Sequence, residues 1–279
     1  MWLPYVDSHE SHPLMYAVPM NRRPRSRQGG TDLSIRERAY LHIQQLLLSG
    51  KLEAGSSVSE QLLARDLGSS RTPIREAMNQ LAAEGLLEQS PNGGMIVSQL
   101  GREDIIELYE LREALEVYAV GKIARTPLRP VDRDRLQSLI DEVSVFRKEL
   151  EKSKKDALDE AQMSRFLTCD LGFHALLMSL AFNSRMQKSM SETRLLISVF
   201  AIRRSGHDKE ALTNIQKYHQ NILNAIVKQD KEAAMRELAE HIQESQRERV
   251  NEYDQWRRET SMRQSMPAFY DHPTITNHR

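Results

Sequence analysis

Apolar residues recur at the spacing of an α-helix through most of the second half of the chain. The periodic segments run at about 103–125, 132–152, 156–180, 184–205, 209–229 and 231–257, and short breaks such as TPLRP and SGHD separate them. Helices joined by short connections pack as antiparallel neighbours. The pattern therefore predicts an all-α antiparallel bundle of six or seven helices over residues 101–257. From 258 to 279 the period is lost and two prolines appear, which predicts a flexible tail.

Residues 34–100 show a different order of elements. Three helical segments end near Gly50, Gly68 and Glu84, and two short strands, LLEQS and MIVSQL, follow around the turn PNGG. Two short helices joined by a tight turn that contains a glycine are typical of the helix-turn-helix motif. With the β-hairpin after them, the segment predicts a winged helix-turn-helix of three helices and a hairpin. The expected fold class is thus mostly α.

Two arginines lie in the first turn of the third helix, within the stretch SSRTPIREAM. Cations are disfavoured at this end of a helix dipole, so the position of Arg71 and Arg75 needs an explanation. Their spacing of four places them on one face of the helix, and it is not the face of the apolar set Ile74, Ala77, Met78 and Leu81. In a helix-turn-helix this helix end enters the major groove, where arginine can bind guanine or phosphate. The alternative is a pair of solvated arginines, and the order of the elements favours DNA.

Charge limits how such a domain could bind DNA. Residues 34–100 hold six basic and seven acidic residues, a net charge of −1, whereas a non-specific binder would be basic. Binding would then have to depend on a local patch, on the N-terminal arm and on dimerisation over two half-sites. Residues 1–33 contain NRRPRSRQGG, with four arginines, which is either a solvated tail or a basic arm near nucleic acid.

A second candidate site lies in the predicted bundle. Asp170 and His174 are one helical turn apart, while His219 and His241 lie eleven residues before and after Asp230, the predicted turn between the last two helices. At about 1.5 Å per residue both histidines reach the same height in an antiparallel hairpin. Three imidazoles and one carboxylate suit Zn²⁺, Ni²⁺ or a similar ion. A polar network within the core is the alternative.

Other features of the sequence exclude several classes of protein. No apolar run approaches the roughly 20 residues of a membrane span, and the N-terminus has no secretory signal pattern. The single cysteine, Cys169, excludes an internal disulfide and fits a reducing compartment. We therefore expect a cytoplasmic protein associated with the nucleoid. His42 and His207 have no ligand spacing, so we expect no metal there.

The segment 36–98 resembles the winged-helix domain of the GntR family of bacterial transcription regulators. The shared landmarks are SEQLLA, LGSSRTPIREA, LAAEGLL and the final GMIV. The resemblance implies DNA contacts at the positions that match the family pattern, which are Gln61, Arg71, Thr72, Pro73, Arg75 and Gly94. This chain departs from the pattern at Gln61, where arginine is common, and at Gly93, where the wing tip is often basic.

Residues 103–248 resemble the FCD effector domain of the FadR-type subgroup of that family. ELYELREALEVYAV, the Asp170 to His174 motif, YHQNILNAI and AEHI carry this resemblance. It implies a divalent metal, most simply zinc, held by Asp170, His174, His219 and His241. It also implies a small organic acid bound beside the metal. Arg112 and Arg194 are candidate partners for its carboxylate, with surface salt bridges as their alternative role.

Together these features predict a metal-containing, ligand-responsive repressor of a metabolic operon. It would bind operator DNA as a homodimer, with no catalytic residues. Two alternatives remain at this point. One is a metal-dependent enzyme that uses the Asp/His₃ site, and the other is a DNA-binding protein whose bundle only dimerises.

Overall fold

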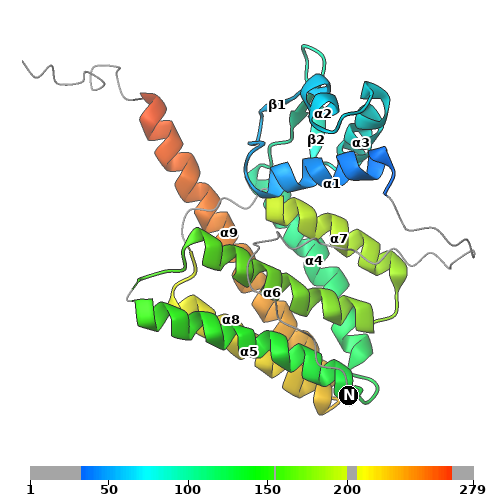
Figure 1. The fold of residues 1–279 in the computed structure, drawn as a ribbon. Coiled ribbons are helices and arrows are strands. Elements are labelled where there is room, and N and C mark those ends of the chain that lie inside the picture. The colour runs from blue at the N-terminus through cyan, green and yellow to red at the C-terminus, as the bar shows by residue number, and fades with distance from the viewer. Residues whose placement is uncertain (1–32, 154, 200–205, 266–279) are drawn as a thin grey trace, which may run out of the picture. The chain divides into compact units, whose positions relative to one another are not determined.

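A computed structural model describes residues 33–153, 155–199 and 206–265, and side chains as far as 262 (Figure 1). The described residues form nine helices and three short strands. This confirms the mostly α fold with a small N-terminal helix-turn-helix region. The arginine-rich segment of the predicted N-terminal arm and most of the predicted tail lie outside the described residues.

The N-terminal part is a winged helix-turn-helix. Its helices are α1 (Ile35–Leu48), α2 (Glu60–Asp66) and α3 (Arg71–Ala83), and its strands are β1 (Ser57–Val58), β2 (Leu87–Gln89) and β3 (Met95–Val97). The strands form one antiparallel sheet in the order β1-β3-β2. The predicted hairpin is therefore present, but its sheet has a third strand. The sequence predicted only a turn at KLEAGSSVS, because two residues are too few to show a strand period.

Local signals explain where these helices begin and how they pack. The Ser34 side chain accepts a hydrogen bond from the Glu37 backbone and Glu37 reciprocates, which is a capping box at the start of α1. Helix α3 begins after Ser70, whose side chain makes no capping bond. The apolar face predicted for α3 is the buried one, and it packs in a single core with residues of α1 and the sheet.

The C-terminal part is a helical bundle of six described helices. Their bounds are α4 (Arg102–Ile123), α5 (Pro130–Ser153), α6 (Glu160–Leu180), α7 (Ser184–Val199), α8 (Lys209–Val227) and α9 (Lys231–Ser265). Helix α8 packs on both α5 and α9, and α4 packs along α9 (Figure 1). Helix α9 continues past 257, so the start of the predicted tail at 258 falls within a helix. The polar stretch at its end has little apolar period, so the sequence carries no local signal for this part of the helix.

Two apolar clusters fill the bundle. The larger includes Phe173, Leu177, Ile222 and Leu238 from α6, α8 and α9. The smaller surrounds Phe146 and contains Cys169, whose thiol donates to the Leu139 carbonyl at 3.0 Å. Burial raises the pKa of this thiol to about 12, so Cys169 is an unreactive packing residue. None of the described helices is both long and apolar enough to cross a membrane.

Candidate metal centre and nucleic-acid interface

The four residues predicted to bind a metal converge on one point inside the bundle. Asp170 and His174 come from α6, His219 from α8 and His241 from α9. One donor atom from each lies within 4.8 Å of all the others. The Nε2 atom of His241 is 3.2 Å from that of His219 and 3.3 Å from that of His174. The Oδ1 atom of Asp170 is 3.5 Å from His219 Nε2 and 4.0 Å from His174 Nε2.

Three of these four separations, 3.2, 3.3 and 3.5 Å, are close to the spacing of ligand atoms around a tetrahedral cation. With metal–donor bonds of about 2.0–2.1 Å, the edges of the tetrahedron are roughly 3.3 Å long. The contacts among the histidines are poorly explained as hydrogen bonds alone. Nε2 of His241 carries either a proton or a lone pair, yet it has two close nitrogen neighbours. The donor set could therefore hold a zinc-like ion.

The protonation of the histidines also suits ligands. All three imidazoles are buried, at 0–3% exposed. Burial lowers the pKa of His219 to about 3 and that of His241 well below its usual value. The pKa of His174 is lowered as well, chiefly by burial. These side chains are thus neutral near pH 7, with lone pairs available to a cation.

Packing and hydrogen bonding orient the rings to different degrees. The His219 ring stacks on Phe173, with 4.0 Å between the ring centroids, and its Nδ1 is buried without a hydrogen-bond partner. His174 instead places Nδ1 2.6 Å from Oε2 of Glu116. A ligating histidine normally has such a partner on its second nitrogen. His174 meets this rule through its side-chain neighbour, and His219 depends on stacking.

Glu116 is the residue of this site that the sequence did not single out. Its carboxylate is 1% exposed and also accepts hydrogen bonds from Arg112, at 3.0 Å, and from Arg194, at 2.6 Å. Burial opposes its ionisation, but the charges of Arg194 and Arg112 and the hydrogen bond from His174 hold the pKa of Glu116 well below the usual range. The available signal was its position four residues after Arg112, on the buried face of α4.

Arg112 and Arg194 lie in the site and are not surface residues. They are 8% and 9% exposed, which contradicts the alternative of surface salt bridges. The Nη2 atom of Arg112 is 3.0 Å from His174 Nε2, and Arg194 donates to the Leu171 carbonyl. Nε of Arg194 is buried without a partner. Two guanidinium groups, one with an unused donor, thus border the Asp/His cluster.

The predicted DNA-contacting residues lie at the surface of the winged helix. Arg71, Thr72 and Arg75 are exposed at the start of α3 and Pro73 is half-buried, while Gln61 is exposed on α2. Gly94 is exposed in the turn between β2 and β3. Gly93 and Gly94 have φ angles of 85° and 82°, which favour glycine. This backbone explains why the wing tip carries glycine at position 93 and not a basic side chain.

Arg75 differs from Arg71 in its surroundings. Its Nε and Nη2 donate to the two carboxylate oxygens of Glu60, the first residue of α2, at 2.9 and 2.8 Å. This ion pair joins α3 to α2, and the hydrogen bonds from Arg75 lower the pKa of Glu60. The arginine side chain remains 60% exposed. The ion pair therefore fixes the direction of the guanidinium without hiding it.

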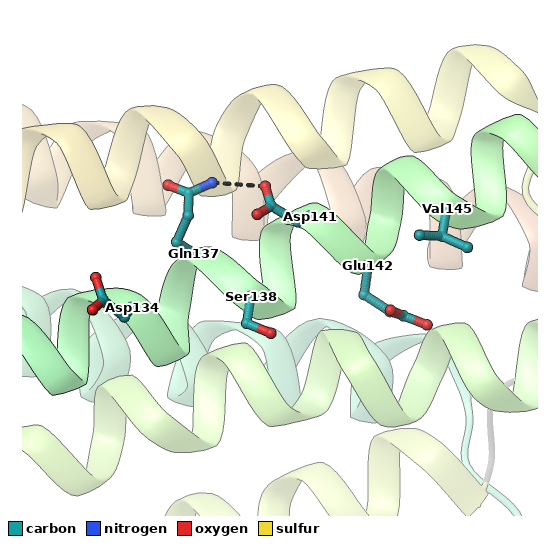
Figure 2. A pocket seen from close by; sticks show the side chains of 6 residues that line it. All are labelled: Asp134, Gln137, Ser138, Asp141, Glu142 and Val145. Carbon is teal, nitrogen blue, oxygen red and sulfur yellow. Dashed lines mark hydrogen bonds between the residues drawn. The ribbon is translucent and has the colours of Figure 1, made fainter.

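A separate hollow of about 330 Å³ lies along α5, away from the Asp/His cluster. Figure 2 shows its six lining side chains, all from α5, with Gln137 bonded to Asp141. Three of the six are acidic, and none belongs to a predicted site.

Comparison with known proteins agrees with this architecture. Residues 35–97 match the family model described as bacterial regulatory proteins, gntR family, and residues 107–244 match the FCD domain. The HTH-type transcriptional regulator YdhC of Bacillus subtilis (strain 168) is 27% identical over 203 residues, covering 73% of this chain and 85% of that protein. A protein of Paenarthrobacter nicotinovorans named "Probable D-xylose utilization operon transcriptional repressor" is 29% identical, with 70% and 80% covered.

The fold also matches solved structures. E. coli McbR/YncC superposes with a TM-score of 0.64 at 21% identity, covering 81% of this chain and all of that one. Proteins that combine these two domains bind DNA and regulate transcription, and they are not enzymes, which excludes the metalloenzyme alternative. The chain belongs to the GntR family of bacterial transcription regulators, with an FCD domain after its DNA-binding domain.

Proposed function

We propose that this regulator is a metal-containing repressor that responds to a small anionic ligand and binds its operator as a homodimer. The observation that carries the proposal is the convergence of four donor atoms within 4.8 Å inside the FCD domain. Asp170, His174, His219 and His241 would hold a divalent ion, with zinc as the first candidate. The ion would supply positive charge and an open coordination position for a ligand.

The charges around the cluster favour an anionic ligand. Among the described residues at the site, Arg112 and Arg194 balance Asp170 and Glu116, and the three histidines are neutral. A divalent cation would add two positive charges that no further carboxylate offsets. A small carboxylic acid placed against the arginines would offset them, and the unused Nε of Arg194 could donate to it.

The contact between Arg112 and His174 would couple binding of the metal to binding of the anionic ligand. An arginine only donates hydrogen bonds, so Arg112 Nη2 uses the lone pair of His174 Nε2. That lone pair is the one a cation would take. Binding of a metal would therefore release the Arg112 donor, which a carboxylate could then accept. The two ligands would bind more tightly together than separately.

Helix α7 offers a route from this site to the DNA-binding domain. Arg194 bonds to Glu116 within the site, and the next two residues, Leu195 and Leu196, pack against the core of the winged helix. A ligand that draws Arg194 away from Glu116 would shift α7, and so change the free energy of one arrangement of the winged helices relative to another. Repression is proposed by analogy with the D-xylose relative named above.

Metal analysis combined with DNA binding tests the proposal. The matched set is wild type, His219→Ala, His241→Ala and His207→Ala, the last being a histidine of the same domain outside the cluster. We expect about one metal ion per chain in wild type and His207→Ala, and little in the other two. A DNA site selected in vitro from a random pool would serve as operator. Mass analysis of the purified protein would identify its ligand. Light scattering would give the oligomeric state.

The possible outcomes separate the alternatives. Loss of metal together with loss of ligand-dependent DNA binding supports the sensor. If His219→Ala and His241→Ala keep full metal content, the site assignment is wrong. If a dimeric, metal-free wild type binds the operator and no ligand changes that binding, the helical domain only dimerises.

A further inference from the structure

Glu116 contacts three functional side chains from three helices. It lies on α4 with Arg112, whereas His174 comes from α6 and Arg194 from α7. Its Oε2 atom faces His174 Nδ1 at 2.6 Å. Its Oε1 atom accepts from Arg112 Nε at 3.0 Å and from Arg194 Nη2 at 2.6 Å. Oε2 of Glu116 thus contacts the Asp/His cluster, and Oε1 contacts the arginine pair.

The tautomer of His174 follows from two contacts. Arg112 can only donate, so Nε2 of His174 must accept at 3.0 Å and carries no proton. The proton of the neutral ring is then on Nδ1, where it is donated to Glu116 Oε2. This tautomer leaves Nε2 of His174 without a proton at the Asp/His cluster, so that its lone pair is shared between Arg112 and any bound cation. The opposite tautomer would place a proton there and would block a metal.

We propose that Glu116 is a positioning residue for both halves of the site. It fixes the ring and tautomer of His174 for metal binding, and it holds Arg112 and Arg194 at the edge of the cluster. The inference rests on the proposed metal site and extends it to a residue that would not itself touch the metal. A carboxylate on the second nitrogen of a ligating histidine typically contributes 10- to 100-fold to metal affinity. The competing role is a structural counter-ion for two buried arginines.

The test compares Glu116→Gln with Asp132→Asn by chelator competition for zinc. Asp132 is a matched control because it is 2% exposed in the same domain and accepts from an arginine, Arg129, at 2.5 Å, but lies outside the cluster. We expect zinc to bind Glu116→Gln about 10- to 100-fold more weakly than wild type, and Asp132→Asn to bind as wild type does. Because Glu116→Gln leaves two buried guanidinium groups less compensated, the double variant Glu116→Gln/Arg194→Gln restores the charge balance. It should also bind zinc weakly.

Nuclear magnetic resonance of the histidine nitrogens gives a readout that a purely structural role would not change. In zinc-free wild type, His174 should show a single tautomer with the proton on Nδ1. The Glu116 variants lose the carboxylate that accepts from Nδ1 and that holds Arg112 against Nε2, so in these variants, when folded, His174 should show a mixture of tautomers. Wild-type zinc affinity and an unchanged tautomer in a folded Glu116 variant would overturn the inference. Equal weakening in Asp132→Asn would also overturn it. If wild type itself binds no zinc, the proposed metal site fails instead, so the two failures are distinguishable.

Discussion

Replacing the two arginines of α3 should show how this regulator reads DNA. Arg75 uses one N–H of Nε and one of Nη2 for Glu60. A guanidinium has five N–H donors, so three remain, on Nη1 and Nη2. Two of these can bond O6 and N7 of a guanine at once. The ion pair with Glu60 thus leaves Arg75 aimed and still able to make a two-bond contact.

The size of the effect follows from this count. A two-bond arginine–guanine contact discriminates by roughly 5- to 150-fold, and a dimer on two half-sites loses two of them. We therefore expect Arg75→Ala to weaken operator binding by roughly 25- to 2 × 10⁴-fold, and Arg71→Ala to weaken it to a similar degree if it also reads a base. If Arg71 binds only phosphate, its replacement should instead reduce the salt dependence by about one unit for each phosphate that it neutralises.

Fluorescence anisotropy with the selected operator, over a range of salt concentrations, measures both quantities. Arg65→Ala is the matched control, because Arg65 is a 76% exposed arginine of α2 that is not on α3. Glu60→Gln should raise non-specific DNA binding, since it removes a negative charge, and should lower the ratio of specific to non-specific affinity. The reasoning is refuted if Arg75→Ala is folded and binds the operator as tightly as Arg65→Ala does.

Two further predictions concern stability. Zinc at a hundredfold excess over its Kd should stabilise the folded protein by about 2.7 kcal/mol, which is roughly 5–10 °C in Tm, and calorimetry that detects no zinc-dependent shift would contradict this. Burial lowers the pKa of His207 to about 4, below the unfolded value of about 6.5. The unfolded chain therefore takes up a proton first as pH falls. Below about pH 6.5 this histidine should therefore lower the free energy of unfolding by up to about 1.4 kcal/mol per pH unit. In urea unfolding between pH 7 and 4.5, the free energy of unfolding of zinc-free His207→Gln should fall less steeply with decreasing pH than that of zinc-free wild type. Equal slopes in the two proteins would count against the lowered pKa of His207.

The sequence by itself was sufficient for the elements that depend on local pattern. Helix periodicity located the helices of both domains, and the turn residues around Gly68 placed the helix-turn-helix. Two signals were too weak to be read locally. Strand β1 has only two residues, and the polar end of α9 lacks an apolar stripe. Both form because neighbouring structure supports them, with β3 pairing to β1 and the preceding turns of α9 extending the helix.

The equal spacing of His219 and His241 from Asp230 is enough to predict that the two histidines lie at the same height, because a short turn makes two helices run side by side. The sequence could not show that Glu116 joins the cluster to the arginines, or that Glu60 holds Arg75. These are contacts between residues 58 and 78 positions apart for Glu116 and 15 apart for Glu60. They depend on how helices cross and rotate against one another, and only tertiary packing decides that.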